Sequence, residues 1–320
     1  MPRLLLPLFT AAVSTVVVSL TSAPAEAGAP DNRSAAPLEI ALIADTPYGD
    51  AQRAAFPALV DDINADPQVR MVLHAGDIKN GSSTCSDERF ADLAQLYGTF
   101  ADPFVYTPGD NEWTDCHRPA AGRYLPTERL AAVRSVFYPE AGQTLGRRTM
   151  TVTTQATDPR FSAYVENTRF TRSRVVVASV HVVGSSNGLD PWSGLVGGDR
   201  PAERLAEFES RRAAALAWID EAFDSAVRED SAGVLLMMQA EPVGDGMTEV
   251  RARIVERALA FGRPVLLVHG DEHRYEQEPT YAGVSNLTRL ETFGDTASSW
   301  LRLTVDPRSP SVFSWAPQDV

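Results

Sequence analysis

Four short polar segments of this chain carry side chains that can bind a metal ion, and each one follows a hydrophobic run. The segments are Asp45-Thr46-Pro47-Tyr48, Gly76-Asp77-Ile78-Lys79-Asn80, Gly109-Asp110-Asn111-Glu112 and His269-Gly270-Asp271-Glu272-His273. The preceding runs are rich in Val, Ile and Leu, which is typical of buried parallel strands. Open α/β folds bind their ligands at the carboxyl ends of such strands. The sequence therefore predicts a cluster of carboxylate, amide and imidazole groups suited to a metal-dependent hydrolase.

The elements that position these segments alternate between strand and helix from Leu38 onward, which predicts an α/β fold. Strands are expected at residues 38–44, 69–75, 104–106, 174–183, 234–238 and 264–268. Helices are expected at residues 51–64, 87–99, from 127 onward, at 201–228 and at 249–261. Three β-like segments without helices between them come last, and they predict the edge of a second sheet: Asn286–Thr292, Ser298–Val305 and Ser311–Trp315.

The first residues have the features of a secretory signal peptide. Residues 4–20 are apolar, and Ala25-Glu26-Ala27 matches an A-x-A cleavage site. We expect cleavage after Ala27 and a secreted or extracytoplasmic protein, with no membrane span left after cleavage. An uncleaved membrane anchor is the open alternative.

The rest of the chain is expected to form a flexible leader at residues 28–37 and one domain at 38–320. Residues 140–172 interrupt the alternation and are predicted to be an insertion over the sheet.

The overall charge argues against a nucleic-acid partner. The chain of 320 residues has a formal net charge of −13, and Lys79 is its single lysine. No basic stripe is present, so we expect no nucleic-acid polymer as a partner. An anionic substrate would need a local cation, which a bound metal provides.

The two cysteines, Cys85 and Cys116, follow two of the predicted strand ends. In an exported chain such a pair is expected to form a disulfide, worth about 3–4 kcal/mol in the chain-entropy model. A thiolate metal site is the alternative, with less support because no C-x-x-C spacing is present.

These motifs, in this order, resemble those of the calcineurin-like metallophosphoesterase superfamily over about residues 38–305. The family motifs are D-x-H, G-D, G-N-H or G-D-N-H, a lone His and G-H-x-H. The resemblance implies a four-layer α/β/β/α sandwich and a two-metal centre that acts on a small phosphate-containing substrate. Matched position by position, it implies metal ligation by Asp45, Asp77, Asn111, Gln239, Asp271 and His273.

Four positions depart from the family pattern, each having lost a histidine: Pro47, Glu112, Gln239 and Asp271. The chain looks closest to a divergent secreted bacterial branch with D-T-P-Y and G-D-N-E at these places. The remaining ligand set is rich in oxygen, which favours Mn²⁺, Mg²⁺ or Ca²⁺ over Zn²⁺. We expect one or two such ions.

Other residues are candidates for catalysis or substrate binding. Glu112 can donate a proton if burial or a neighbouring carboxylate raises its pKa, and His269 can compensate for the missing histidine at position 271. Lys79 and Arg274 are candidates for binding substrate phosphate. For Lys79 and Arg274 the alternative is a solvated or salt-bridged loop residue.

The sequence therefore favours an exported metal-dependent phosphoesterase that uses a metal-activated water. One alternative is a catalytically impaired protein of the same fold that binds a ligand or partner, because four histidines are replaced. Another is a purely structural envelope protein.

Overall fold

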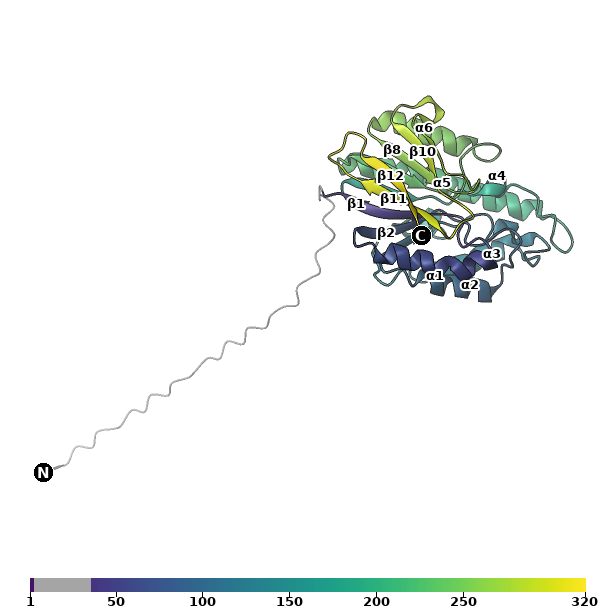
Figure 1. Ribbon diagram of the computed structural model, residues 1–320, viewed down its shortest axis with the longest axis horizontal. Coiled ribbons are helices and arrows are strands. Elements are labelled where there is room, and N and C mark those ends of the chain that lie inside the picture. Colours follow the sequence, from purple (N-terminus) through teal and green to yellow (C-terminus); the bar gives the residue numbers. More distant parts are fainter. Residues whose placement is uncertain (3–35) are drawn as a thin grey trace. The chain divides into compact units, whose positions relative to one another are not determined.

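Two β-sheets form the centre of the computed structural model, which describes residues 1–2 and 36–320 (Figure 1). The predicted signal peptide at residues 1–27 and most of the predicted leader at 28–37 lie outside the described residues. No helix in the described part of the chain has both the length and the apolar composition needed to cross a membrane.

The first sheet has five strands, and its centre carries three of the predicted motifs. In spatial order the strands are β12 (Phe313–Asp319), β11 (Ser299–Val305), β1 (Leu38–Ile43), β2 (Val69–His74) and β3 (Phe104–Tyr106). Strands β1, β2 and β3 are parallel, so their carboxyl ends lie at one edge of the sheet. Strand β11 pairs antiparallel with β1.

The second sheet has seven strands. In spatial order they are β4 (Thr153–Thr154), β5 (Thr168–Arg172), β6 (Val175–Ser179), β7 (Gly233–Met237), β8 (Val265–His269), β10 (Leu287–Glu291) and β9 (Glu276–Glu278). Strands β6, β7, β8 and β10 are parallel. The predicted insertion at residues 140–172 contains β4 and β5, which form one edge of this sheet.

One prediction about the last three β segments was wrong. They do not share one sheet edge, because β10 lies beside β8 in the second sheet whereas β11 and β12 extend the first. Segment order alone does not specify which sheet a strand joins, since the pairing depends on long-range contacts.

Helices cover the outer faces of both sheets. The first sheet packs against α1 (Asp50–Ala65), α2 (Asp87–Tyr97) and α3 (Pro126–Phe137), and the second against α5 (Pro201–Arg228) and α6 (Thr248–Phe261). Short elements complete the described chain: α4 (Gly184–Gly188), η1 (Thr114–His117), η2 (Gln155–Thr157), η3 (Pro159–Phe161) and η4 (Tyr281–Gly283).

Strand alternation explains why these strands read as continuous apolar runs. In β1, Ile40 and Leu42 pack between the sheets, while Ala41 and Ile43 pack against the helices. In β7, Leu235 faces the other sheet and Leu236 faces the helix layer. Both faces of each sheet are thus buried, and the predicted four-layer α/β/β/α sandwich is confirmed.

Candidate metal centre

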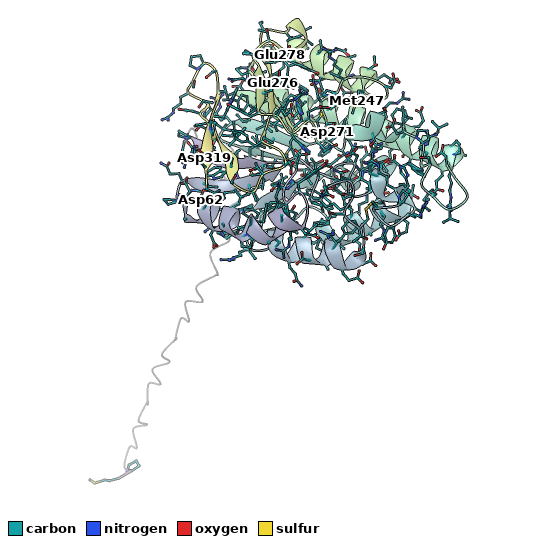
Figure 2. The ribbon with its side chains drawn as sticks, turned by 45° about the vertical axis from the view of Figure 1, so that its right-hand side comes forward. Asp62, Met247, Asp271, Glu276, Glu278 and Asp319 are labelled. Carbon is teal, nitrogen blue, oxygen red and sulfur yellow. A yellow bond between two sulfur atoms is a disulfide. The ribbon has the colours of Figure 1, made fainter. Side chains whose placement is uncertain are left out.

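The loops after β2, β3 and β8 bring three carboxylates together. Asp77, Asp110 and Asp271 each place one carboxylate oxygen within 4.8 Å of the others. Asp77 and Asp110 are buried and Asp271, which is labelled in Figure 2, is half-buried. Three converging carboxylate oxygens are a typical arrangement for a hard divalent cation.

Asn111 orients Asp77 from the neighbouring loop. Its side-chain Nδ2 donates to Asp77 Oδ2 at 2.7 Å, and its backbone N–H donates to Asp77 Oδ1 at 3.2 Å. Each oxygen of Asp77 therefore accepts one hydrogen bond and keeps a lone pair for a cation.

Asp45 and His273 meet beside this cluster. The backbone N–H of Asp271 donates to the two carboxylate oxygens of Asp45 at 3.1 and 3.3 Å. His273 Nε2 lies 3.6 Å from Asp45 Oδ1 and is buried without a hydrogen-bond partner in the described chain. Its ring stands edge-on to Tyr48, with the ring centroids 4.4 Å apart. A buried, unpartnered imidazole nitrogen next to carboxylates is what a metal site without its ion would show.

Gln239 lies next to Asp271, but both polar atoms of its side-chain amide already form hydrogen bonds within the protein. Gln239 Nε2 donates to Asp271 Oδ1 at 2.6 Å, and Gln239 Oε1 accepts from the backbone N–H of Gly184 at 2.6 Å. Gln239 thus holds Asp271 in position. Direct metal ligation by Gln239 stays a prediction.

Asp110 is a candidate ligand that the sequence reasoning did not single out. Ser185 Oγ donates to Asp110 Oδ2 at 2.6 Å and to Asp115 Oδ1 at 3.0 Å. The available signal was its place directly before Asn111 in a strand-end loop. Such a loop contains several acidic residues. Only the tertiary structure shows which of them points toward the neighbouring loops.

Two motif glycines permit this close approach. A Cβ atom on Gly109 would lie 2.1 Å from Asp77 Oδ1, and one on Gly270 would lie 2.2 Å from Asp45 Oδ2. Both distances are far shorter than van der Waals contact, so any larger side chain here would displace a carboxylate of the centre.

Burial and mutual repulsion perturb the acids of the centre. Burial, followed by the charges of neighbouring carboxylates, raises the pKa values of Asp45 and Asp77 well above their ordinary range. The same causes raise the pKa of Asp271 to about 7 and that of Asp115 to about 7. Buried carboxylates are costly unless a cation neutralises them, so this donor set fits a divalent ion.

The comparisons with known proteins agree with this geometry. The family model for calcineurin-like phosphoesterases matches residues 38–275. The chain belongs to the calcineurin-like phosphoesterase family. The predicted family resemblance is thereby confirmed.

Several solved structures are similar to this calcineurin-like phosphoesterase at low sequence identity. A purple acid phosphatase from yellow lupin (Lupinus luteus) seeds has 10% identity and a TM-score of 0.49, over 91% of this chain and 55% of that one. A 5'-nucleotidase from Candida albicans has 13% identity and a TM-score of 0.44, over 88% and 52%. GAP50, the anchor in the inner membrane complex of Plasmodium, has 8% identity and a TM-score of 0.46, over 89% of each chain. The chain thus spans about half the length of the first two. No curated protein sequence matches it.

Glu112, at the family's catalytic-histidine position, is fully buried in this phosphoesterase. Its Oε1 accepts hydrogen bonds from the Tyr106 hydroxyl at 2.5 Å and from the backbone N–H of Gly109 at 2.6 Å. Burial raises the pKa of Glu112, and a raised pKa is what a carboxyl group needs to act as a proton donor. Its contacts, however, are those of a residue that holds the Gly109 turn, and proton donation stays a prediction.

His269 and Arg274 are not brought into the cluster. His269 Nδ1 donates to the Gly270 carbonyl at 2.8 Å, and His269 Nε2 accepts from Arg289 Nη1 at 3.2 Å, so both ring nitrogens are occupied. Burial lowers the pKa of His269 to about 4, which keeps the ring neutral at pH 7. The Arg274 side chain is exposed, and its Nη2 lies 3.3 Å from Glu272 Oε2. Their predicted roles in catalysis and substrate binding remain untested.

Lys79 is a buried cation among these acids. Its Nζ donates to the Asn80 carbonyl at 3.1 Å. Burial lowers its pKa to about 8, against the opposing effect of the Glu112 and Asp77 carboxylates. The solvated alternative is therefore wrong, because Lys79 is wholly inaccessible to solvent. Contact with substrate phosphate stays a prediction.

The two cysteines form a disulfide. Cys85 in the loop after β2 is bonded to Cys116 in η1, with Cα atoms 5.8 Å apart, as predicted. The Asn111 carbonyl oxygen lies 3.6 and 3.7 Å from the two sulfurs. The bond thus fixes two loops next to a residue of the centre.

Proposed function

We propose that this protein is an exported hydrolase of small phosphate esters that depends on a divalent metal. The observation that carries the proposal is the convergence of Asp77, Asp110 and Asp271 beside the unpartnered His273 nitrogen. Membership of the calcineurin-like phosphoesterase family supports the same reaction class. The signal-peptide features of residues 1–27 support export.

The residues that would hold one or two ions are Asp45, Asp77, Asp110, Asn111, Asp271 and His273. Oxygen dominates this set, which favours Mn²⁺, Mg²⁺ or Ca²⁺. When bound, such an ion supplies a Lewis acid that polarises phosphoryl oxygens and lowers the pKa of water.

The chain's own residues orient this centre for the reaction. Asn111 fixes both oxygens of Asp77, and Gln239 fixes Asp271 through its side-chain amide. The buried ammonium of Lys79 supplies a fixed positive charge that offsets part of the acidic charge. Positioned groups of this kind keep ligands in place without reorganisation during the reaction.

The test combines metal binding with hydrolysis. Isothermal titration of the chelator-treated protein with Mn²⁺, Mg²⁺ or Ca²⁺ is paired with turnover of p-nitrophenyl phosphate and bis(p-nitrophenyl) phosphate. We expect at least one ion to bind and to support turnover, and Asp77→Ala to abolish both. Asp61→Ala, an exposed acid on α1, is the matched control and should behave as wild type. Equal turnover by wild type and Asp77→Ala would overturn the proposal.

A second candidate function is ligand binding without turnover. It is favoured by the closed environment of Glu112, whose Oε1 accepts from Tyr106 and Gly109, and by the occupied amide of Gln239. Saturable binding of inorganic phosphate with no hydrolysis of either ester in any metal would support it.

Export is tested separately. Expression of the full chain with a carboxyl-terminal tag should release protein to the culture medium or periplasm, with Gly28 as its first residue. A cytoplasmic protein with residues 1–27 intact would contradict export.

A further inference from the structure

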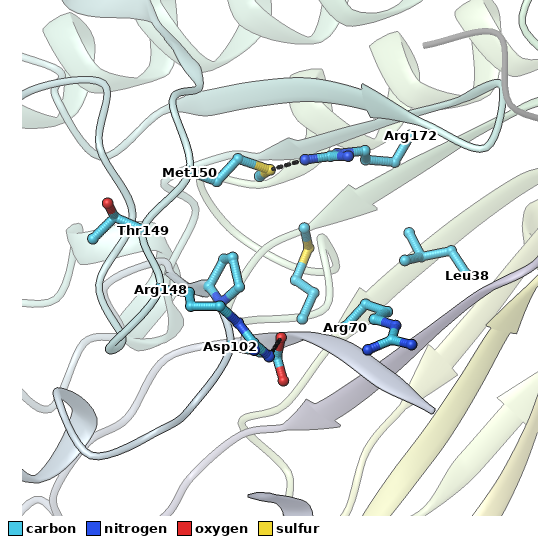
Figure 3. Close-up of a pocket in the computed structure, with 9 residues that line it drawn as sticks. Leu38, Arg70, Asp102, Arg148, Thr149, Met150 and Arg172 are labelled. Atoms are coloured by element: carbon cyan, nitrogen blue, oxygen red, sulfur yellow. Dashed lines mark hydrogen bonds and ion pairs between the residues drawn. The ribbon is translucent and has the colours of Figure 1, made fainter. Parts of the chain in front are cut away.

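A cavity of about 430 Å³ opens at the sheet edge opposite the metal centre. Figure 3 shows the residues that line it. Leu38 begins β1, and Arg70 lies at the start of β2, whereas the metal centre lies beyond the carboxyl ends of the same strands. Arg172 ends β5, which runs antiparallel to β6, so it pairs with Val175 at the beginning of that strand. The cavity therefore lies between the two sheets at their other edge.

Three arginines and one carboxylate provide its charge. Asp102 forms an ion pair with Arg148. Within the described chain, the Arg172 guanidinium has only a weak acceptor, since its Nη2 donates to the Met150 sulfur at 3.2 Å. The Arg70 guanidinium forms no hydrogen bond or ion pair with any described residue. Two guanidinium groups thus lack an anionic partner among the described residues, in a chain whose formal net charge is −13.

The floor of the cavity is apolar. Leu38, Met71 and Met150 line it, and all three belong to the buried core between the sheets. The site therefore presents cationic groups above an apolar surface, and its volume is within the range of small-molecule pockets, roughly 300–1,000 Å³.

We propose that this cavity binds a small amphipathic anion, a molecule with a phosphate or carboxylate group attached to a short apolar chain. The planar guanidinium of Arg70 or Arg172 matches the geometry of either oxyanion and binds it with paired hydrogen bonds. The apolar part of the ligand replaces water over Met71 and Met150. This site is separate from the metal centre, and its existence does not depend on the proposed hydrolysis.

The test is calorimetric titration of the chelator-treated full chain with octyl phosphate, octanoate and inorganic phosphate. We expect at least one octyl compound to bind, and to bind more tightly than inorganic phosphate because of the apolar floor. A preference for octyl phosphate identifies a phosphate ligand, and a preference for octanoate a carboxylate ligand.

Substitutions of the lining residues test whether the ligand binds in this cavity. Arg70→Gln/Arg172→Gln should weaken binding at least about tenfold, since two charge-assisted contacts are lost. Thr149→Glu places a negative charge at an exposed position of the lining and should weaken binding without affecting the fold. Arg228→Gln, an exposed arginine at the end of α5, is the matched control and should bind as wild type. Thermal unfolding of each variant without ligand checks that it is folded.

Failure of all three compounds to bind overturns the proposal. Wild-type affinity in both Arg70→Gln/Arg172→Gln and Thr149→Glu overturns it as well. Neither result affects the metal-dependent hydrolysis, which is measured with other substrates at the opposite sheet edge.

Discussion

Asn111 binds both carboxylate oxygens of Asp77, one through its side-chain Nδ2 at 2.7 Å and the other through its backbone N–H at 3.2 Å. The two residues lie in loops that follow different strands, β2 and β3. The orientation of the Asp77 carboxylate therefore depends on the side-chain amide of Asn111.

Replacing Asn111 should weaken the centre without dismantling the fold. Asn111→Ala removes the donor to Asp77 Oδ2 and a candidate ligand, so we expect metal affinity to fall about 10–100-fold. Titration calorimetry with the preferred ion measures this loss. Asn286→Ala, whose amide binds backbone carbonyls of Ala258 and Arg263, is the control. Unchanged affinity in Asn111→Ala would show that Asp77 is oriented by other groups.

In the metal-free protein, the contribution of Asp271 and Asp115 to the free energy of unfolding should decrease as the pH rises from about 4 to about 7. Burial and the charge of Asp110 raise the pKa values of Asp271 and Asp115 to about 7, whereas unfolded aspartate titrates near 3.9. Between these pH values Asp271 and Asp115 bind more protons in the folded state than in the unfolded state, so their contribution to the free energy of unfolding decreases with increasing pH. Burial lowers the pKa values of His74 and His269 to about 4, and these two groups act in the opposite direction below about pH 6.5.

Urea unfolding at pH 5, 6, 7 and 8 with a chelator present measures this dependence. Asp271→Asn should flatten it, and saturating metal should reduce it because the bound ion stabilises the ionised carboxylate. A pH dependence of Asp271→Asn that equals that of the chelated wild type would contradict the assignment of the Asp271 shift.

Glu166, which is not among the candidate metal ligands, should contribute strongly to folding stability. It is fully buried, and its Oε1 lies 2.6 Å from Arg134 Nη2 and 2.8 Å from His181 Nδ1. Glu166→Gln leaves Arg134 without its anionic partner, and we expect a loss of about 3 kcal/mol in urea unfolding at pH 7. Asp158→Asn, which breaks an exposed ion pair with Arg160, is the control and should show no measurable change.

The pH dependence of the same variant gives a second test. Burial alone would raise the pKa of Glu166, but Arg134 and His181 lower it to about 2, below the unfolded value near 4.3. The stabilisation is therefore complete above pH 4.3 and is lost as the pH falls toward 2. The difference between wild type and Glu166→Gln should close over that interval. A constant difference down to pH 2 would assign the effect of the substitution to packing.

Removing the disulfide should destabilise the protein and loosen the centre. Cys85 and Cys116 are 31 residues apart, for which the chain-entropy model gives about 3–4 kcal/mol. We expect Cys85→Ser/Cys116→Ser to lose about this much in urea unfolding, and to bind metal more weakly because Asn111 lies against the bond. A reduced wild-type protein with an unchanged unfolding midpoint would count against this estimate.

The sequence by itself determined the alternation of strands and helices and the edge at which the site is found, whereas the four layers followed from the family resemblance. Short apolar runs ended by Gly and Asp predicted parallel strands, and parallel strands place their carboxyl ends together. The pairing of Cys85 with Cys116 also followed from their number and positions.

Only the tertiary structure decided which side chains meet. It brought Asp110 to Asp77 and Asp271, turned His269 toward Arg289, and satisfied the Gln239 amide within the protein. The physical reason lies partly in the backbone of the loops. Asp45, Asp77, Asp271 and His273 have φ values of 50°, 57°, 83° and 59°. This left-handed conformation redirects each side chain away from the alternation of the strand before it, and packing of the surrounding loops maintains it.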